Sequence, residues 1–502
     1  MASRAPLPSI CVALGLPTAE KLLEHARREI NLGESFLEFR LDYLADPLQG
    51  VEAIRTLLGS YPDCMILATC RRHQNHGRFN GSIEEQLRIL HQAVEAGARA
   101  VDVEIESAER ARAGLDELRA KTFFIVSYHN YEGTPPLEPL LKRMGKVAAD
   151  AWKIVTTARK PSDSQRVLAL SKAFPRGRLI LLAMGEMGFP TRVLSPAMGG
   201  LYTYAAPSSA EGTAAGQVCS RQLRHLYRID KFTRMAKVFG VIADPVRHSI
   251  SPQVHNRALQ ARRVDGVYLP FLVRAPQLRD FMICAEKLPV TGFSVTLPHK
   301  QRIVRYLDAI EPLARRIGAV NTVWRKAGKW RGTNTDTDGV TVPLAKHLRL
   351  SKAKILVIGN GGAARGAAFS LVDAGAAVSI TARNPDRARA LAKAAGAEAV
   401  PRELALQRSR RWDAIVHATP LGMWPQVEEC FFEDYIPGDL VFDMVYKPRE
   451  TRLLRLAREQ GCAVITGVEM FVEQAVRQFE IFTGESAPRA LMEKTALEAL
   501  TP

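Results

Sequence analysis

One lysine of this sequence stands where a carbonyl-attacking amine would be expected. Lys153 interrupts the apolar run 151–155, which has the pattern of a buried strand. Burying an ammonium there is costly, so we expect this amine to have a lowered pKa and to be partly neutral, as a Schiff-base nucleophile must be. The alternative is a structural lysine whose head group pairs with Glu104 or Glu38.

A histidine favours the chemical interpretation. His129 ends the preceding apolar run 123–128, so its ring is expected to face Lys153 from an adjacent strand end. An imidazole can take and return protons near neutral pH. Fixed cations suited to a small carboxylate come from Arg40, Arg71 and Arg192. The residues predict an imine-forming lyase or aldolase that acts on an anionic carbonyl compound.

A second set of polar residues offers hydroxyls, an amide, one lysine and one aspartate. They lie in four short clusters at 248–252, 294–300, 318–322 and 332–336. A Lys300–Asp336 pair could relay a proton to an oxygen that gains negative charge during hydride transfer. Each cluster alone could be an ordinary turn, but their combination indicates a polyol-binding site.

A glycine-rich turn joins the strand-like run 354–358 to an alanine-rich helix. The turn consists of Gly359, Asn360, Gly361, Gly362 and Ala363. Such a turn is a weak signal by itself, but the next strand leads into Arg383, Asn384 and Arg387 instead of an acidic residue. Arginine accommodates the 2′-phosphate of NADP, whereas an acidic residue would bind the ribose of NAD. The alternative is an ordinary helix entry capped by Asn384.

Two different patterns of strands and helices, one in each half of the chain, are expected to position these residues. Between residues 9 and 206, eight strand-like runs alternate with helical patterns, which predicts a (β/α)8 TIM barrel. The carboxyl ends of barrel strands carry the active site, and polar residues gather there: Glu38, Arg40, Arg71, Glu104, His129, Lys153 and Glu186. The α/β fold continues with a substrate domain and a Rossmann domain. We expect a barrel over 1–230, a linker over 231–237, a substrate domain over 238–345 plus 468–502, and a dinucleotide domain over 346–467.

The first half resembles type I 3-dehydroquinate dehydratase over most of residues 9–230. The matching motifs lie at 38–42, 69–71, 127–129, 152–154, 184–192 and 213–217. The resemblance implies that Lys153 forms an imine with the substrate ketone, and that His129 removes the α-proton and then helps water leave. It also implies that Arg192 holds the ring or its carboxylate. The residues implied for the hydroxyls are Glu38, Arg40, Arg71, Thr213 and Gln217.

One position departs from that family. A glutamate followed by two glycines usually orients the histidine, and Asn75 stands in its place here. An amide can hydrogen-bond an imidazole but cannot stabilise its cation as a carboxylate would. We therefore expect a slower dehydratase, or one in which Glu104 takes over the role.

The second half resembles shikimate dehydrogenase over nearly all of residues 238–501, including the motifs at 418–423, 443–446 and 467–474. The resemblance implies that Lys300 and Asp336 are the catalytic pair. Substrate contacts are implied for Ser249, Ser251, Thr296, Asn321, Tyr446 and Gln474. The hydroxyls of Ser251 and Thr296 go with shikimate rather than quinate. Cofactor contacts are implied for Thr419, Met444 and Gly467, in addition to the glycine-rich turn and the two arginines that follow the next strand.

Composition narrows the function classes. At 502 residues, the chain is expected to form two or three domains. The net charge of +17 is spread along helices without interleaved aromatics, so we expect no nucleic-acid partner, and no apolar run predicts a membrane span. Seven scattered cysteines without a CxxC pair favour a cytoplasmic protein with neither disulfides nor a metal. The expected partners are therefore small molecules.

The two halves together suggest consecutive reactions, because the dehydratase product 3-dehydroshikimate is the dehydrogenase substrate. This domain order resembles the bifunctional dehydratase–dehydrogenases, which use NADP. Two alternatives stay open. The chain could be a dehydrogenase with an impaired or repurposed barrel, or a regulator that binds pathway metabolites without turnover.

Overall fold

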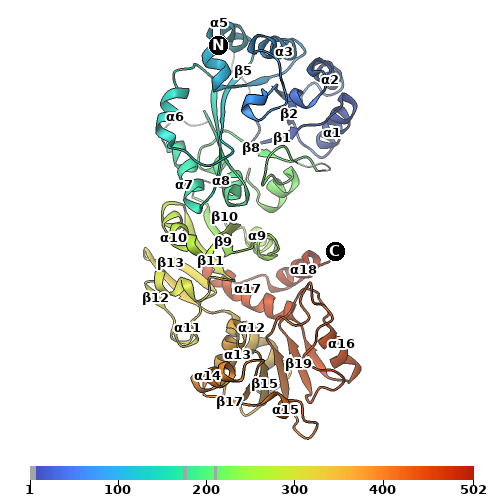
Figure 1. Cartoon of the computed structure of the whole chain (residues 1–502), viewed down its shortest axis with the longest axis vertical. Coiled ribbons are helices and arrows are strands. Elements are labelled where there is room, and N and C mark those ends of the chain that lie inside the picture. The colour runs from blue at the N-terminus through green and yellow to red at the C-terminus, as the bar shows by residue number, and fades with distance from the viewer. Residues whose placement is uncertain (1–6, 173–177, 209–211, 234, 502) are drawn as a thin grey trace. The chain divides into compact units, whose positions relative to one another are not determined.

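The computed structural model describes residues 7–172, 178–208, 212–233 and 235–501 (Figure 1). The chain divides into two compact units. The first contains the residues up to Ala236 together with Phe271–Val273 and Arg279–Leu288, and the second contains the remainder. None of the described helices is both long enough and apolar enough to cross a membrane.

The first unit is built on eight parallel strands. They are β1 (Ile10–Leu14), β2 (Phe36–Arg40), β3 (Met65–Thr69), β4 (Ala100–Glu104), β5 (Phe123–His129), β6 (Ala151–Thr157), β7 (Leu179–Met184) and β8 (Thr203–Ala205). Their order in the sheet is β7-β6-β5-β4-β3-β2-β1-β8. The backbone N–H of Leu201 donates to the carbonyl of Leu179 at 2.7 Å and so joins the two ends of the sheet. The predicted TIM barrel is confirmed.

Helices surround this barrel in Figure 1. They are α1 (Ala19–Asn31), α2 (Pro47–Ser60), α3 (Ile83–Glu95), α4 (Ile105–Arg110), α5 (Arg112–Lys121), α6 (Leu137–Met144), α7 (Pro161–Ala169) and α8 (Phe189–Ala197). Side chains cap several of them, as Thr18 does for α1 and Asp46 for α2. Ser82 and Glu85 form a reciprocal capping box at α3, which satisfies backbone N–H groups that a helix start leaves unpaired.

The interior of the barrel is apolar at one end and polar at the other. Because side chains alternate along a strand, Phe36, Glu38 and Arg40 of β2 share one face. Phe36 packs in an apolar cluster with Leu67 and Ile125, while Glu38 and Arg40 lie nearer the carboxyl ends of the strands. The apolar layer supports the polar one, which is where a barrel carries its site.

The segment 214–230 is mostly loop. Residues 213–217 form a loop, and a short π-helix follows at Gln222–Leu226. The N–H of Gly185 donates to the Ala215 carbonyl at 3.3 Å, and Gly216 has a φ of 78°. A Cβ at Gly216 would approach the Gly185 carbonyl oxygen to 2.8 Å. This close approach holds the loop against the end of β7.

The second unit begins with a mixed six-stranded sheet. Its strands are β9 (Lys237–Ala243), β10 (Gly266–Leu272), β11 (Val290–Val295), β12 (Ala309–Ile310), β13 (Thr322–Lys326) and β14 (Lys329–Thr333), in the order β10-β9-β11-β13-β14-β12. The helices of this part of the chain are α9 (Ser251–Ala261), α10 (Leu278–Lys287) and α11 (Pro312–Ile317), and the C-terminal α17 (Gly467–Thr483) and α18 (Arg489–Ala499) return to it.

The remaining sheet has six parallel strands. They are β15 (Lys354–Ile358), β16 (Ala377–Thr381), β17 (Glu398–Ala399), β18 (Ala414–His417), β19 (Leu440–Asp443) and β20 (Ala463–Ile465). The accompanying helices are α12 (Asp336–Ala345), α13 (Gly362–Asp373), α14 (Pro385–Ala395), α15 (Arg402–Ala405) and α16 (Arg452–Glu459). The order β17-β16-β15-β18-β19-β20 is that of a doubly wound dinucleotide fold, whose switch point lies between β15 and β18. The predicted Rossmann domain is confirmed.

Gly359, which follows β15, is expected to tolerate no side chain. Its φ is 129°, and a Cβ would approach the Ala418 carbonyl oxygen to 2.7 Å. Gly359→Ala should therefore lower the free energy of unfolding by about 2–3 kcal/mol, seen by calorimetry as a fall in the Tm of the second unit. At Gly361 a Cβ would meet nothing within 4 Å. Gly361→Ala should cost less than about 1 kcal/mol, and equal losses for both variants would contradict the argument.

Candidate active sites

Lys153 is the centre of the polar layer in the barrel. It is the third residue of β6, and its side chain is 5% exposed. Its Nζ donates to Asp102 Oδ2 at 2.9 Å and to Tyr204 Oη at 2.8 Å, and Glu38 Oε1 lies 3.8 Å away. The predicted Glu38 neighbour is present, but the two closest partners were not predicted from the sequence.

Asp102 is the carboxylate that compensates the buried cations. Its Oδ1 accepts from Arg71 at 2.9 Å and from Ser127 at 2.6 Å. Burial alone would raise the pKa of Asp102, but Arg71, Lys153 and His129 together hold this pKa well below its ordinary value. Asp102 is therefore ionised throughout the physiological range.

Other carboxylates in the layer have partners of their own. Glu104 accepts from the Arg72 N–H at 2.9 Å and from the Gln86 side chain at 2.6 Å. Glu38 accepts from Thr69 at 2.7 Å. Arg40 makes two hydrogen bonds to Asp42, at 2.9 and 2.8 Å. The polar layer is thus a set of paired charges, and Glu104 is committed to the start of the loop after β3.

His129 is the last residue of β5, two residues beyond Ser127, which pairs with Lys153 across β5 and β6. Burial, followed by the fields of Arg71 and Lys153, lowers the pKa of His129 well below its ordinary value. The imidazole is therefore neutral near pH 7 and can act as a base. Its Nδ1 is buried and has no hydrogen-bond partner among the described residues. An aromatic neighbour, Tyr131, lies with its ring centroid 6.3 Å from that of the histidine.

Asn75 does not orient this histidine. Its Nδ2 donates to Glu106 Oε2 at 2.9 Å, and the other oxygen of Glu106 lies 3.3 Å from Arg143. Glu104 does not replace it either, because its oxygens are taken by Arg72 and Gln86. With Asn75 at the position where a glutamate was expected, the His129 imidazole has no anionic orienting group among the described residues.

Arg192 on α8 is a buried cation without a carboxylate partner in the described residues. It is 1% exposed, its Nη2 donates to the Ala215 carbonyl at 2.9 Å, and its Nε has no hydrogen-bond partner. Burial lowers its pKa to about 10. The same loop carries Thr213, whose Cγ2 lies beside Gly15, and Gln217, which accepts from the Ala214 N–H at 3.2 Å. Glu186 begins the short 3-10 helix Glu186–Gly188 after β7.

A second site is built around a lysine–aspartate pair in the second unit. Lys300 Nζ donates to Asp336 Oδ2 at 2.6 Å, while Asn321 Nδ2 donates to Asp336 Oδ1 at 2.8 Å. The Asn321 oxygen accepts from the Thr335 N–H at 2.7 Å, which fixes the amide orientation. The structure therefore brings together the predicted Lys300, Asp336 and Asn321, and it adds Thr335, which is 1% exposed.

Hydroxyl groups line the sheet beside this pair. Tyr268 donates to Ser294 at 2.7 Å, and Ser294 donates to Gln478 at 2.6 Å. Ser249 Oγ accepts from the Ser251 N–H at 3.3 Å, and Thr296 opens the turn that leads to Lys300. Tyr268 and Gln478 were not predicted, because each lies on an element that otherwise has the pattern of buried core.

The C-terminal helix α17 supplies further predicted residues. A Cβ at Gly339 of α12 would lie 2.9 Å from the Met470 carbonyl oxygen and 3.4 Å from Gln474 Cβ, so α12 and α17 pack closely. Gln474 Nε2 donates to the Phe471 carbonyl at 2.9 Å. The ring of Tyr446 lies 5.8 Å from that of Phe471, and burial raises the pKa of this tyrosine.

The carboxyl edge of the parallel sheet has the features of a phosphate site. Helix α13 starts at Gly362 without a side-chain cap, and added Cβ atoms at Gly361 and Gly362 would meet nothing within 4 Å. The start of this helix is therefore open, and a phosphate fits at such an uncapped helix N-terminus. Arg383 and Arg387 are exposed nearby in sequence, while Asn384 caps α14 by accepting from the Arg387 N–H at 3.0 Å. Asn360 and Ala363 complete this turn, and Gly467 begins α17.

A buried histidine fixes the loop after β18. The two ring nitrogens of His417 bond to Asp443 at 2.9 Å and to Thr419 at 2.5 Å. Thr419 Oγ1 also accepts from the Leu421 N–H at 3.2 Å, and the Met444 N–H donates to the His417 carbonyl at 3.0 Å. The predicted residues Thr419 and Met444 are therefore held at the carboxyl ends of β18 and β19.

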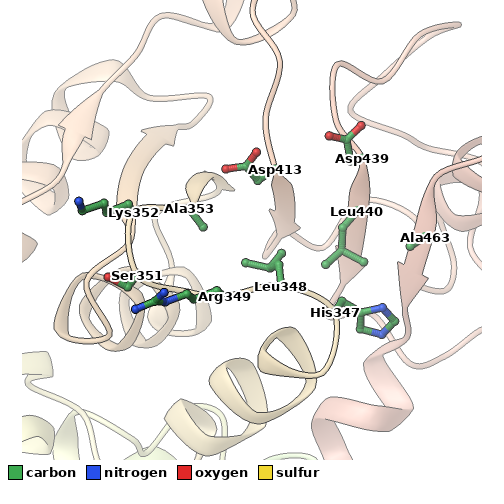
Figure 2. A pocket seen from close by; sticks show the side chains of 10 residues that line it. All are labelled: His347, Leu348, Arg349, Ser351, Lys352, Ala353, Asp413, Asp439, Leu440 and Ala463. Carbon is green, nitrogen blue, oxygen red and sulfur yellow. The ribbon is translucent and has the colours of Figure 1, made fainter.

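A hollow of about 490 Å³ lies in the same domain, and Figure 2 shows the side chains around it. It is lined by His347, Leu348, Arg349, Ser351, Lys352, Ala353, Asp413, Asp439, Leu440 and Ala463. These residues precede β15, β18 and β19 or begin β19 and β20, so the hollow lies at the amino edge of the sheet. Nucleotides bind at the carboxyl edge of such sheets, and the hollow is therefore separate from the proposed chemistry.

Four family models match successive stretches of the chain. Type I 3-dehydroquinase matches residues 10–233, and the shikimate dehydrogenase substrate binding domain matches residues 241–323. Shikimate / quinate 5-dehydrogenase matches residues 343–422, and the shikimate 5′-dehydrogenase C-terminal domain matches residues 467–497.

Individual proteins agree with these models. The chain is 36% identical to the chloroplastic bifunctional 3-dehydroquinate dehydratase/shikimate dehydrogenase of Arabidopsis thaliana, over 96% of this chain and 83% of that protein. It is 40% identical to the shikimate dehydrogenase (NADP+) of Methanosarcina acetivorans, over 53% of this chain and 99% of that protein. A crystal structure of a shikimate dehydrogenase in complex with NADP+ superposes with a TM-score of 0.51 and 33% identity, covering 54% of this chain and 98% of that one.

Arg192 offers a stability test of the barrel site. A buried cation that lacks an anionic partner destabilises the ligand-free protein, so Arg192→Met should raise the free energy of unfolding by about 1–3 kcal/mol. The measurement is the urea midpoint of the first unit. The exposed Arg27→Met serves as the control and should change stability by less than about 0.5 kcal/mol. A loss of stability in Arg192→Met would show that the guanidinium is a structural group.

Proposed function

The chain belongs to the family of bifunctional 3-dehydroquinate dehydratase/shikimate dehydrogenases, and from this premise we propose that it catalyses both reactions. The barrel dehydrates 3-dehydroquinate to 3-dehydroshikimate, and the second unit reduces 3-dehydroshikimate to shikimate with NADPH. The observation that carries the proposal is the occurrence, in one chain, of a buried Lys153–Asp102 pair in a barrel and a Lys300–Asp336 pair beside a dinucleotide fold.

In the barrel, the substrate ketone condenses with the Lys153 amine, and its oxygen leaves as water. The resulting protonated imine withdraws electrons from the neighbouring carbon, which makes the α-proton acidic. Neutral His129 takes this proton and returns it to the departing β-hydroxyl, so that a second water leaves as the double bond forms. Hydrolysis of the imine then regenerates Lys153 and releases the product ketone.

Substrate binding in the barrel rests on fixed cations and neutral donors. Arg192 would give its unpaired Nε and a buried charge to the substrate carboxylate, which supplies the anion that it lacks. Glu38, Arg40, Arg71, Thr213 and Gln217 would contact the hydroxyls. The imidazole of His129 has no orienting carboxylate on Nδ1, which favours a dehydratase slower than one with the family glutamate.

In the second unit, the hydride for the carbonyl carbon would come from NADPH when it is bound. The Lys300 ammonium donates a proton toward the carbonyl oxygen, and Asp336, held by Asn321, keeps the lysine in position. Ser249, Ser251, Thr296, Tyr446 and Gln474 would hold the carboxylate and hydroxyls of the substrate.

The chain's own residues fit NADP. Open N–H groups at the start of α13, next to Gly359, Gly361 and Gly362, would bind the pyrophosphate. Arg383 and Arg387 would bind the 2′-phosphate, as arginines at this place in the fold do. Asn360, Ala363, Asn384, Thr419, Met444 and Gly467 would complete the cofactor site.

The proposed division is a dehydratase over 1–230, a linker over 231–237, a substrate domain over 238–345 plus 468–502, and an NADP domain over 346–467. We also propose a cytoplasmic location, supported by seven cysteines that are all free thiols, as in a reducing compartment.

The dehydratase proposal is tested by trapping. Addition of 3-dehydroquinate and borohydride to the wild-type protein should add substrate mass to the peptide that contains Lys153. Lys153→Arg should give no adduct, whereas His129→Ala should still trap substrate while turnover falls by about 10²–10⁴-fold. A protein that reduces 3-dehydroshikimate but forms no adduct would be a dehydrogenase with an impaired barrel. Loss of both activities would favour a metabolite-binding regulator.

The cofactor proposal is tested by coenzyme preference. Arg383→Ala combined with Arg387→Ala should raise the KM for NADPH by about 10²–10⁴-fold, because two charge-assisted hydrogen bonds, each worth about 1.5–3 kcal/mol, are lost. The KM for NADH should stay within about twofold, since NADH lacks the 2′-phosphate. Arg389→Ala on the same helix is the matched control, because Arg389 pairs with Asp386. A parallel rise for both coenzymes would contradict the assignment.

A further inference from the structure

Asp102 has no role in the chemistry described so far, yet it is the carboxylate nearest to the reacting nitrogen. Its Oδ2 accepts from Lys153 Nζ at 2.9 Å, whereas Glu38 Oε1 lies 3.8 Å from the same nitrogen. Glu38 is also shared with Thr69 and Tyr204, at 2.7 and 3.5 Å. The strongest compensation of the Lys153 charge therefore comes from Asp102.

The two oxygens of Asp102 have separate tasks. Oδ1 is held by Arg71 at 2.9 Å and Ser127 at 2.6 Å, and Arg71 also donates to Ser127 at 3.0 Å. Oδ2 is left for Lys153. Asp102, Ser127 and Lys153 lie on the adjacent strands β4, β5 and β6, so the carboxylate is fixed by the sheet and not by a loop.

The charge on Nζ does not change during condensation. An ammonium and a ketone give a protonated imine and one water: the C=O bond is replaced by C=N, and two N–H protons leave with the oxygen. The nitrogen carries one positive charge before and after the step. A fixed anion beside Nζ thus compensates the resting lysine and the covalent adduct equally.

We propose that Asp102 is a positioning residue that acts as the counter-ion of the Lys153 nitrogen, both as ammonium and as protonated imine. This inference rests on the Schiff-base function proposed above. Asp102 thereby sets the pH range in which the amine becomes free to attack, and it keeps the imine protonated, which is the form that acidifies the α-proton.

Several charged and titratable groups surround Lys153. They are Cys11 on β1, Glu38 on β2, Arg71 after β3, Asp102 on β4, His129 on β5, and Tyr202 and Tyr204 on β8. Burial raises the pKa values of both tyrosines and of the thiol well above their ordinary values, so these groups are neutral at pH 7. Glu38 is therefore the other anion close to Nζ, and it is the farther one.

The test is the pH dependence of adduct formation. Initial rates of trapping with 3-dehydroquinate and cyanoborohydride are measured from pH 5 to 9 for the wild type and Asp102→Asn. Loss of the anion makes the ammonium easier to deprotonate, so the midpoint of the profile should move to lower pH by about one unit or more. Below both midpoints, trapping should be about tenfold faster in the variant, whereas dehydratase turnover should fall because the imine loses its counter-ion.

Two variants separate charge from packing. Asp102→Glu keeps the negative charge and should bring the midpoint back to within about half a unit of wild type, whatever its absolute rate. Tyr204→Phe removes the uncharged partner of Nζ and should leave the midpoint in place. If Asp102→Asn does not fold, this pair still decides, since a shift in Tyr204→Phe or a full-unit shift in Asp102→Glu overturns the inference.

The outcomes also distinguish the inference from its premise. Absence of any Lys153 adduct in the wild type would refute the Schiff-base function itself. An adduct in the wild type together with an unshifted midpoint in Asp102→Asn would refute the counter-ion role alone.

Discussion

The architecture of the first unit depends on the burial of charge within its polar layer. Removing an ion from water costs several kcal/mol unless a partner of opposite sign is held close by. Arg40 is matched by Asp42, and Arg71 and Lys153 share Asp102. Asp102 lies on β4 and Asp42 lies in the short 3-10 helix directly after β2, so both carboxylates are fixed; a carboxylate on a mobile loop would leave the cations uncompensated for part of the time. Arg192 is the unmatched cation among the groups discussed, and it is the one whose proposed partner is the substrate.

The second unit has fewer buried charges to compensate at its proposed site. Its proposed catalytic pair, Lys300 and Asp336, is partly exposed, and the neutral amide of Asn321 orients the carboxylate. In the proposed cofactor site, peptide N–H groups at the start of α13 and exposed arginines would bind the phosphates, and these groups need no buried anion in the free protein. The two proposed sites would thus bind anions differently, the barrel site through buried guanidinium groups and the cofactor site through backbone N–H groups and exposed arginines.

Sequence reasoning located the fold and most of the candidate residues, because strand runs, the glycine turn and the polar strand ends are local patterns. It chose Glu104 and overlooked Asp102, although alternation places both on one face of β4. The two residues differ in their position along the barrel axis and therefore in their partners. Glu104 binds Arg72 and Gln86, whereas Asp102 binds Lys153. That position depends on barrel register. The engagement of Asn75 by Glu106 likewise depends on loop geometry that spacing does not encode.

The two ends of the barrel sheet, β8 and β7, meet at a seam, and this makes one hydrogen bond of Lys153 easier to break than the other. Tyr204 lies on β8, a strand of three residues at one end of the sheet order, and the bond from Leu201 to Leu179 spans the gap to β7. Asp102 lies on β4, which is hydrogen-bonded on both sides. Local opening begins where a sheet has fewest neighbours, so amide hydrogens of β8 should exchange with solvent sooner than those of β4. Local opening between β8 and β7 would break the hydrogen bond between Tyr204 and Lys153 and leave the Lys153–Asp102 ion pair intact.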